Sequence, residues 1–159
     1  MAAGEAPRLI RIATSADDLA AVAALFQEYA ASLPVDLDYQ DFASELAELP
    51  GKYAPPDGAL LIAGDPIALG CVGLRPISDE ICEMKRLYIR PAARGTGLGR
   101  ALADTVVAEA ARLGYRQLRL DTLASMERAI AMYLQMGFQR IDAYYGPTPL
   151  GTVFLERQL

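Results

Sequence analysis

The stretch Arg90–Leu102 reads RPAARGTGLGRAL and holds three glycines at alternate positions: Gly95, Gly97 and Gly99. Glycine lets the backbone take a positive φ or come close to a ligand, because it has no Cβ atom. The apolar run before this stretch, Glu80–Ile89, predicts a strand. The apolar spacing after it predicts a helix over Thr96–Leu113. The sequence therefore predicts a strand, a glycine-rich turn and a helix in direct succession.

Such a turn is a candidate site for a phosphate group. The first backbone N–H groups of the helix have no partner within it, and the helix dipole adds positive potential there. The dinucleotide-binding pattern fails, because its third glycine would fall on Arg100 or Leu102. The Walker pattern fails as well, because Gly99 is followed by Arg100 and Ala101 instead of Lys and Ser or Thr. A tight turn without a ligand is the structural alternative.

The remaining sequence reads as further strands and helices. Hydrophobic spacing predicts helices over Asp17–Ser32, near Asp41–Leu49 and over Ser125–Met136, the first with a capping-box-like start at Ser15 and Asp18. The other predicted strands are Arg8–Thr14, Ala59–Gly64, Ile67–Ile77, Tyr115–Thr122, Phe138–Ile141 and Thr152–Leu159. No repeat or linker divides the chain, so we expect one mixed α/β domain over residues 1–159, with residues 1–7 as a flexible tail.

The composition limits the chemistry. The chain has 159 residues, a net charge of −5 and no histidine, which excludes a Ser-His-Asp triad and argues against a metal site. Cys71 and Cys82 lie in apolar runs, so we expect buried, reduced thiols. The acidic charge argues against nucleic acid as a partner. Basic residues nevertheless gather around the glycine stretch, which suits a small polyanion: Lys85, Arg86, Arg90, Arg94 and Arg100.

Two motifs resemble the GNAT superfamily of acetyl-CoA-dependent N-acetyltransferases. Arg94–Gly99 (RGTGLG) matches the family pattern Arg/Gln-x-x-Gly-x-Gly. The segment Ala129–Phe138 (AIAMYLQMGF) is similar to the last helix and following strand of the family, with Met132 and Tyr133 in its Leu-Tyr positions. The resemblance implies a mixed, mostly antiparallel sheet of about seven strands, splayed in the middle and flanked by about four helices.

The resemblance also implies how acetyl-CoA, the expected cosubstrate, is bound. Backbone N–H groups in the glycine turn would hold the pyrophosphate, and two arginines would add charge. The main chain at the end of the preceding strand would bind the pantetheine arm, and an N–H near Leu87 would polarise the thioester carbonyl. Ser125 stands where many relatives have Asn, near the pantetheine. The implied set is Leu87, Tyr88, Ile89, Arg94, Gly95, Thr96, Gly97, Leu98, Gly99, Arg100 and Ser125.

Tyr133 is the first expected catalytic residue. It matches the family tyrosine that protonates the departing CoA thiolate. Its alternative is a packing role in the core, because Ile130, Tyr133 and Leu134 share one face of an amphipathic helix.

Glu83 is the second expected catalytic residue, as the base that takes a proton from the attacking amine. Strand alternation predicts that it lies on the same face as Lys85, Leu87 and Ile89. An ion pair with Lys85 or Arg119 is the structural alternative. The reserve carboxylates are Glu80 and Asp121.

The expected function is direct acetyl transfer from acetyl-CoA to a primary amine of a small molecule, an amino acid or a peptide. Two alternatives stay open: a non-catalytic acyl-CoA-binding or regulatory module of the same fold, and a domain that uses the glycine turn for another phosphorylated ligand. The acceptor pocket is expected between Leu25–Leu49 and Ala143–Thr152. We expect a cytoplasmic protein with no nucleic-acid or membrane partner, and a homodimer is left open as its assembly.

Overall fold

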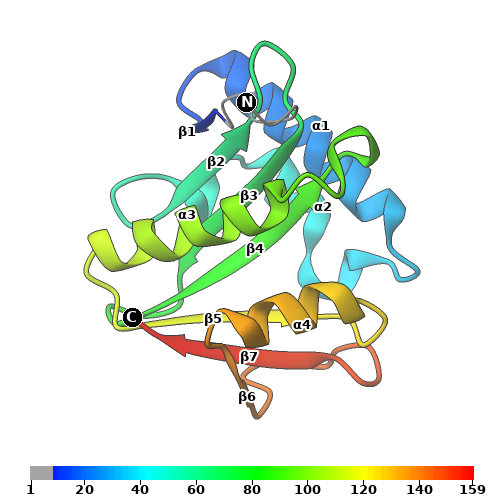
Figure 1. Cartoon of the computed structure of the whole chain (residues 1–159), viewed down its shortest axis with the longest axis vertical. Coiled ribbons are helices and arrows are strands. Elements are labelled where there is room, and N and C mark those ends of the chain that lie inside the picture. The colour runs from blue at the N-terminus through cyan, green and yellow to red at the C-terminus, as the bar shows by residue number, and fades with distance from the viewer. Residues whose placement is uncertain (1–8) are drawn as a thin grey trace.

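The computed structural model describes residues 9–159, so the tail expected at residues 1–7 lies outside the described residues. The chain forms a seven-stranded sheet in the order β1-β2-β3-β4-β5-β7-β6 (Figure 1). Neighbouring strands are antiparallel except β4 and β5, which are parallel, so the predicted mixed sheet is confirmed. The strands are β1 (Ile10–Ile12), β2 (Ala59–Ala63), β3 (Gly70–Pro76), β4 (Ile81–Ile89), β5 (Gln117–Thr122), β6 (Gln139–Ile141) and β7 (Val153–Gln158).

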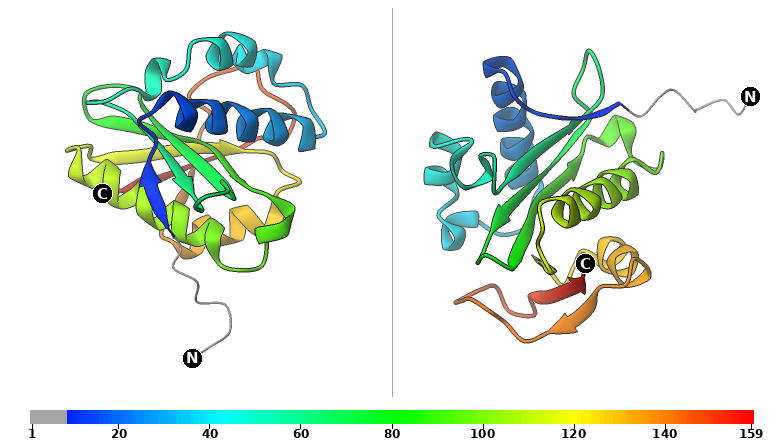
Figure 2. Two further views of the ribbon diagram at one scale, coloured as in Figure 1. Left: turned by 90° about the horizontal axis from the view of Figure 1, so that it is seen from above. Right: turned by 90° about the vertical axis from the view of Figure 1, so that its left-hand side faces the viewer.

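Four α-helices cover the two faces of the sheet. Helices α1 (Ala16–Ser32) and α2 (Phe42–Ala47) lie on one face, and α3 (Leu98–Arg112) and α4 (Glu127–Gln135) lie on the other (Figure 2). None of the helices within residues 9–159 is both long and apolar enough to span a membrane. Three 3-10 turns complete the described elements: η1 (Leu37–Gln40), η2 (Gly51–Tyr53) and η3 (Pro91–Ala93).

Each face of the sheet has its own hydrophobic core. On the α3 and α4 side, the cluster includes Leu102, Val106, Leu118 and Leu155, all fully buried. On the α1 side, the cluster includes Val22, Leu25, Phe26 and Tyr53, together with the Cys71 thiol. Cys71 and Cys82 are both free and buried, as expected from their apolar surroundings.

The parallel contact between β4 and β5 is short. Its three residue pairs are Ile81–Gln117, Cys82–Leu118 and Glu83–Arg119. Beyond Glu83 the two strands diverge, as Figure 1 shows. β3, on the other side of β4, follows it as far as Ile89. The second half of β4 therefore has one edge that β5 does not occupy, and this is the splayed centre of the sheet.

A bulge in β4 overturns one expectation from the sequence. Cys71 of β3 pairs with Tyr88, but Gly73 pairs with Lys85, so β4 has one extra residue in the intervening span. A bulge reverses the side-chain alternation beyond it. Leu87 and Ile89 consequently pack in the same core as Cys82 and Met84, while Lys85 points to the opposite face. The prediction that Glu83, Lys85, Leu87 and Ile89 share a face is therefore wrong.

Candidate active site

The glycine turn prepares the start of α3. Gly95 and Gly97 have positive φ angles of +77° and +83°, which explains why these two positions are glycine. Gly97 is the N-cap of α3, and the amide of Ala101 makes the bond to its carbonyl. The N–H groups of Leu98, Gly99 and Arg100 precede that bond, so no helical carbonyl is available to them. The turn thus presents backbone donors at the positive end of a helix dipole.

The glycine turn also has room beside its backbone. A Cβ atom built on Gly95 would meet no heavy atom within 4 Å, and one built on Gly99 would meet only Ile89 Cγ1, at 3.7 Å. Arg94 donates from Nε to the carbonyl of Ile89 at 3.1 Å. Arg100 pairs with Asp104 at 3.1 Å on the exposed side of α3, an arrangement that holds the arginine only weakly. The site therefore combines open backbone donors with two arginines.

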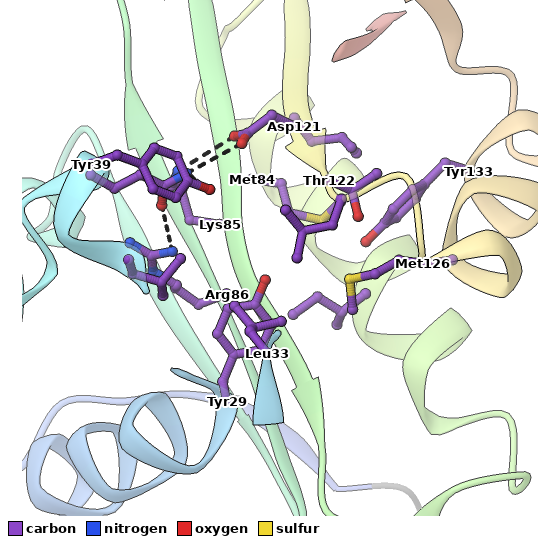
Figure 3. A pocket seen from close by; sticks show the side chains of 16 residues that line it. Tyr29, Leu33, Tyr39, Met84, Lys85, Arg86, Asp121, Thr122, Met126 and Tyr133 are labelled. Atoms are coloured by element: carbon purple, nitrogen blue, oxygen red, sulfur yellow. Dashed lines mark hydrogen bonds and ion pairs between the residues drawn. The ribbon is translucent and has the colours of Figure 1, made fainter. Parts of the chain in front are cut away.

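The gap between β4 and β5 opens into a cavity of about 80 Å³. Figure 3 shows the side chains that line it. Strands β4 and β5 form two walls, α4 forms a third, and the end of α1 with η1 closes the fourth. The lining residues are Tyr29, Leu33, Leu37, Tyr39, Gln40, Met84, Lys85, Arg86, Leu87, Leu120, Asp121, Thr122, Leu123, Met126, Ala129 and Tyr133.

The β4 bulge lies on this cavity. Arg86, at the bulge, has a φ of +62°, a conformation that is uncommon for a residue with a side chain. Its guanidinium is held by Glu45 through bonds of 3.0 and 3.1 Å and by the Gln40 carbonyl oxygen at 2.6 Å. These bonds offset the local strain and fix the backbone of the bulge beside the open edge of β4.

Tyr133 reaches the same cavity from α4. Its ring packs edge-on against Phe138, with ring centroids 5.6 Å apart, and its hydroxyl is directed into the cavity (Figure 3). Within residues 9–159 that hydroxyl makes no hydrogen bond. Burial raises the pKa of Tyr133 above its usual range, so the hydroxyl keeps its proton at neutral pH. It is therefore a protonated donor without a partner in the described chain.

Asp121 supplies the carboxylate of the cavity. Its Oδ2 atom accepts from the Tyr145 hydroxyl at 2.7 Å and from the Gln40 amide at 3.2 Å. Its Oδ1 atom faces the Lys85 ammonium at 3.5 Å. Both side chains are about 95% buried, at 5% exposure for Asp121 and 4% for Lys85. Burial, more than any neighbouring charge, lowers the pKa of Lys85.

Comparison with known proteins gives the family. The family model described as the acetyltransferase (GNAT) family matches residues 14–138. The chain belongs to the GNAT acetyltransferase family. An N-acetyltransferase of Schizosaccharomyces pombe is 41% identical over 129 residues, which cover 79% of each chain. The family match and this relative identify the chain as an N-acetyltransferase. The resemblance of its glycine turn had predicted the same activity.

Solved structures agree with the fold of the acetyltransferase. An acetyltransferase from Streptococcus agalactiae superposes with a TM-score of 0.78 over 97% of this chain and 99% of that one, at 21% identity. A GNAT family acetyltransferase from Elizabethkingia anophelis, solved with acetyl-CoA bound, has a TM-score of 0.64 over 98% and 100% of the two chains, at 20% identity. The predicted splayed sheet with four helices is therefore confirmed as the GNAT architecture.

Glu83 does not line the cavity of the acetyltransferase. It is 3% exposed, accepts from Arg75 Nε at 2.9 Å and accepts from the Tyr144 hydroxyl at 2.6 Å. The alternative partners expected for it are both engaged elsewhere, Arg119 with Glu156 and Lys85 with Asp121. Of the two reserve carboxylates, Glu80 is exposed at the surface and Asp121 lies on the cavity.

The remaining predicted residues lie in the glycine turn, on the cavity or outside both, and Tyr88 is in the core on the α1 side. Leu87 and Tyr133 line the cavity, whereas Ser125 is exposed in the turn before α4 and its neighbour Met126 lines the cavity instead. Gln40, Lys85 and Arg86 of this acetyltransferase were not among the predicted site residues. The sequence signal for Lys85 and Arg86 was weak, two consecutive cations inside an apolar strand, and Gln40 was marked only by its place in the segment Leu25–Leu49.

Proposed function

We propose that this acetyltransferase transfers an acetyl group from acetyl-CoA directly to the primary amine of a small acceptor. The observation that carries the proposal is that one cavity holds both an unpartnered tyrosine hydroxyl, Tyr133, and a buried carboxylate, Asp121. A proton donor for a leaving thiolate and a proton acceptor for an attacking amine are the two groups that aminolysis of a thioester needs.

The chain fits acetyl-CoA at both ends of this site. Backbone donors of the glycine turn and the side chains of Arg94 and Arg100 would hold the pyrophosphate, with open space beside Gly95 and Gly99. The free edge of β4 offers main-chain groups to an extended pantetheine arm, since β5 leaves that edge after Glu83. The acetyl thioester supplies the electrophilic carbonyl, and an N–H of the β4 bulge beside Leu87 would polarise it.

The side chains of the cavity then perform the proton transfers. Asp121 takes a proton from the acceptor ammonium, which frees the nitrogen lone pair to form the new bond to the carbonyl carbon. As the bond from carbon to sulfur breaks, Tyr133 gives its proton to the departing sulfur. Its raised pKa makes it a donor that is protonated at neutral pH. The nitrogen, which is positively charged once the new bond has formed, gives its second proton to water. After the products leave, water also returns a proton to Tyr133 and takes one from Asp121.

Direct transfer is favoured over a covalent acyl-enzyme. The sequence contains two cysteines, and neither Cys71 nor Cys82 lines the cavity. Burial raises the pKa of each thiol to about 12, so thiolate is scarce at neutral pH.

A thiol-release assay tests the proposal. Acetyl-CoA is incubated with the protein and a panel of primary amines, and the free CoA thiol is followed alongside calorimetric binding of acetyl-CoA. We expect binding, and thiol release that depends on both protein and amine. Binding without turnover of any amine would instead support a regulatory module, and absence of acetyl-CoA binding would leave a different phosphorylated ligand.

A further inference from the structure

Lys85 and Asp121 are buried charged side chains, yet neither uses all of its hydrogen-bonding capacity within residues 9–159. Lys85 has three N–H donors, and its one hydrogen bond within residues 9–159 is the 3.5 Å contact to Asp121 Oδ1. Charge-assisted bonds between nitrogen and oxygen are normally about 2.7–2.9 Å. The ammonium group is also 5.9 Å from the ring centroid of Tyr145, a weaker contact. Two donors of a buried cation are therefore left for a ligand.

Asp121 is satisfied on one oxygen only. Oδ2 accepts the bonds from Tyr145 and Gln40, whereas Oδ1 has only the long contact to Lys85. A carboxylate oxygen can accept two hydrogen bonds. The spare capacity of the pair thus consists of donors on Lys85 and an acceptor on Asp121, and both side chains line the same cavity.

Arg86 is the other cation that lines the cavity, and its hydrogen-bond donors are engaged. Its guanidinium is already bonded to both oxygens of Glu45 and to Gln40, at 2.6–3.1 Å. A ligand anion would have to displace these bonds. Lys85 is therefore the cation of this cavity with donors left for an anionic group.

The separation of the two groups favours a ligand that carries both charges close together. Nζ of Lys85 and Oδ1 of Asp121 are 3.5 Å apart. In an α-amino acid the ammonium and the carboxylate are attached to one carbon atom. Such a molecule can place its ammonium on Asp121 and its carboxylate on Lys85 at the same time, and it would complete the bonds that the pair lacks. The apolar walls formed by Tyr29, Leu33 and Leu37 leave a place for its side chain.

We propose that the acceptor of this acetyltransferase is a free α-amino acid, whose ammonium is held by Asp121 and whose carboxylate is held by Lys85. This inference rests on the proposed function, because the same Asp121 that holds the ammonium takes its proton. A simple alkylamine would leave the donors of Lys85 unused, and a peptide or an amide would offer them a neutral oxygen, which binds an ammonium more weakly.

Matched acceptors test the proposal on the unmodified protein. For each of alanine, leucine and phenylalanine, three compounds are compared: the L-amino acid, its carboxamide and the amine left after removal of the carboxyl group. We expect the best amino acid to exceed its own carboxamide and amine by at least about 10-fold in kcat/KM, the scale of one charged contact. We also expect that amino acid to raise the melting temperature of the protein with CoA present.

Substitution of Lys85 tests the residue. Lys85→Met should reduce the preference for amino acid over alkylamine to about one, with acetyl-CoA binding retained. Because this change leaves Asp121 as an unpaired buried carboxylate, the double variant Lys85→Met with Asp121→Asn serves as a second measurement, in which L-amino acids should no longer raise the melting temperature. Lys52, the other lysine of the chain and an exposed one, gives the matched control Lys52→Met, which should keep the preference.

The outcomes separate this inference from the proposed function. Equal or better turnover of the alkylamines and carboxamides would overturn the α-amino-acid assignment and leave acetyl transfer standing. A Lys85→Met protein that kept the full preference would overturn the role of Lys85. If none of the nine compounds were acetylated while other amines were, the assignment would also be wrong. Loss of acetyl-CoA binding itself would remove the proposed function.

Discussion

At the scale of single residues, the site depends on which polar groups are left without partners. Tyr133 and Tyr115 are both largely buried tyrosines, but the Tyr115 hydroxyl donates to the Asp57 carbonyl at 2.6 Å, whereas that of Tyr133 has no partner within residues 9–159. A hydroxyl that faces a cavity and has no partner in the chain is available to a ligand bound there, which points to a function for Tyr133.

Tyr133→Phe should lower kcat by about 10-fold or more, because the proton donor to the leaving thiolate is lost. The ring and its contact with Phe138 stay, so the melting temperature and the KM for acetyl-CoA should change little. Steady-state kinetics with the preferred acceptor measure this. Tyr115→Phe is the control, which should lose some stability but no activity. Full activity of the Tyr133 variant would assign that residue to core packing.

Replacing each candidate base, Asp121 or Glu83, by its amide distinguishes which of them takes the proton. Asp121→Asn should lower kcat/KM by about 100-fold, with the deficit largest at low pH, where free amine is scarce. Glu83→Gln should have a smaller effect, because Glu83 contacts Arg75 and Tyr144 instead of the cavity. The pH profiles of both variants, with folding checked by circular dichroism, provide the measurement. A larger loss for the Glu83 variant would restore the base expected from the sequence.

At the scale of elements, the predictable features were those set by local sequence. Gly95 and Gly97 mark a turn because few other residues tolerate its φ angles, and Ser15 with Asp18 marks the start of α1 by a capping box. The bulge at Arg86 had no such marker, since arginine has no preference for positive φ. Gln40 meets Asp121 and Tyr145 across 81 and 105 residues of sequence, so only the folded sheet brings them together.

The turn before α3 gives a prediction for acetyl-CoA binding. Gly99→Val should raise the Kd for acetyl-CoA by about 10-fold or more, because the new side chain would fill the open space next to the backbone donors. Calorimetry measures the Kd. Ala108→Val, on the exposed side of the same helix, introduces the same side chain away from the turn and should bind normally. Normal binding by both folded variants would contradict a pyrophosphate site at this turn.

The start of α1 gives a prediction for how the stability of the fold depends on pH. The Arg11 hydrogen bond, followed by the amides of Thr14 and Ser15, lowers the pKa of Asp18 below its usual range. A lowered pKa contributes stability above the unfolded-state value, about 3.9, and that contribution is lost as the pH falls through the folded-state value. Asp18→Asn should therefore lower the melting temperature at pH 7 and progressively less below about pH 4. Asp104→Asn, in an exposed pair, should show a much smaller difference at every pH.

At the scale of the whole molecule, the two thiols report on unfolding. Cys71 and Cys82 are fully buried, one on each side of the sheet, and burial raises each pKa to about 12. Alkylation by iodoacetamide at pH 8 should therefore be slow in the native protein and fast in denaturant. Saturating acetyl-CoA should slow it further, because the ligand binds the native state. Mass spectrometry of the labelled protein measures both rates; fast labelling of the native protein would contradict the burial of the thiols.

The short ladder between β4 and β5 has a mechanical consequence. β1 to β4, with α3, form one antiparallel group of strands, and β5 to β7 form another, and three residue pairs join them in the sheet. The polar contacts Lys85–Asp121 and Tyr144–Glu83 cross the same boundary. A force that pulled these two groups of strands apart would have three residue pairs of the sheet to break, and a thioester arm bound in the gap would add contacts to both groups. The edge at which we propose that the pantetheine arm binds is thus also the edge along which the two groups of strands would separate.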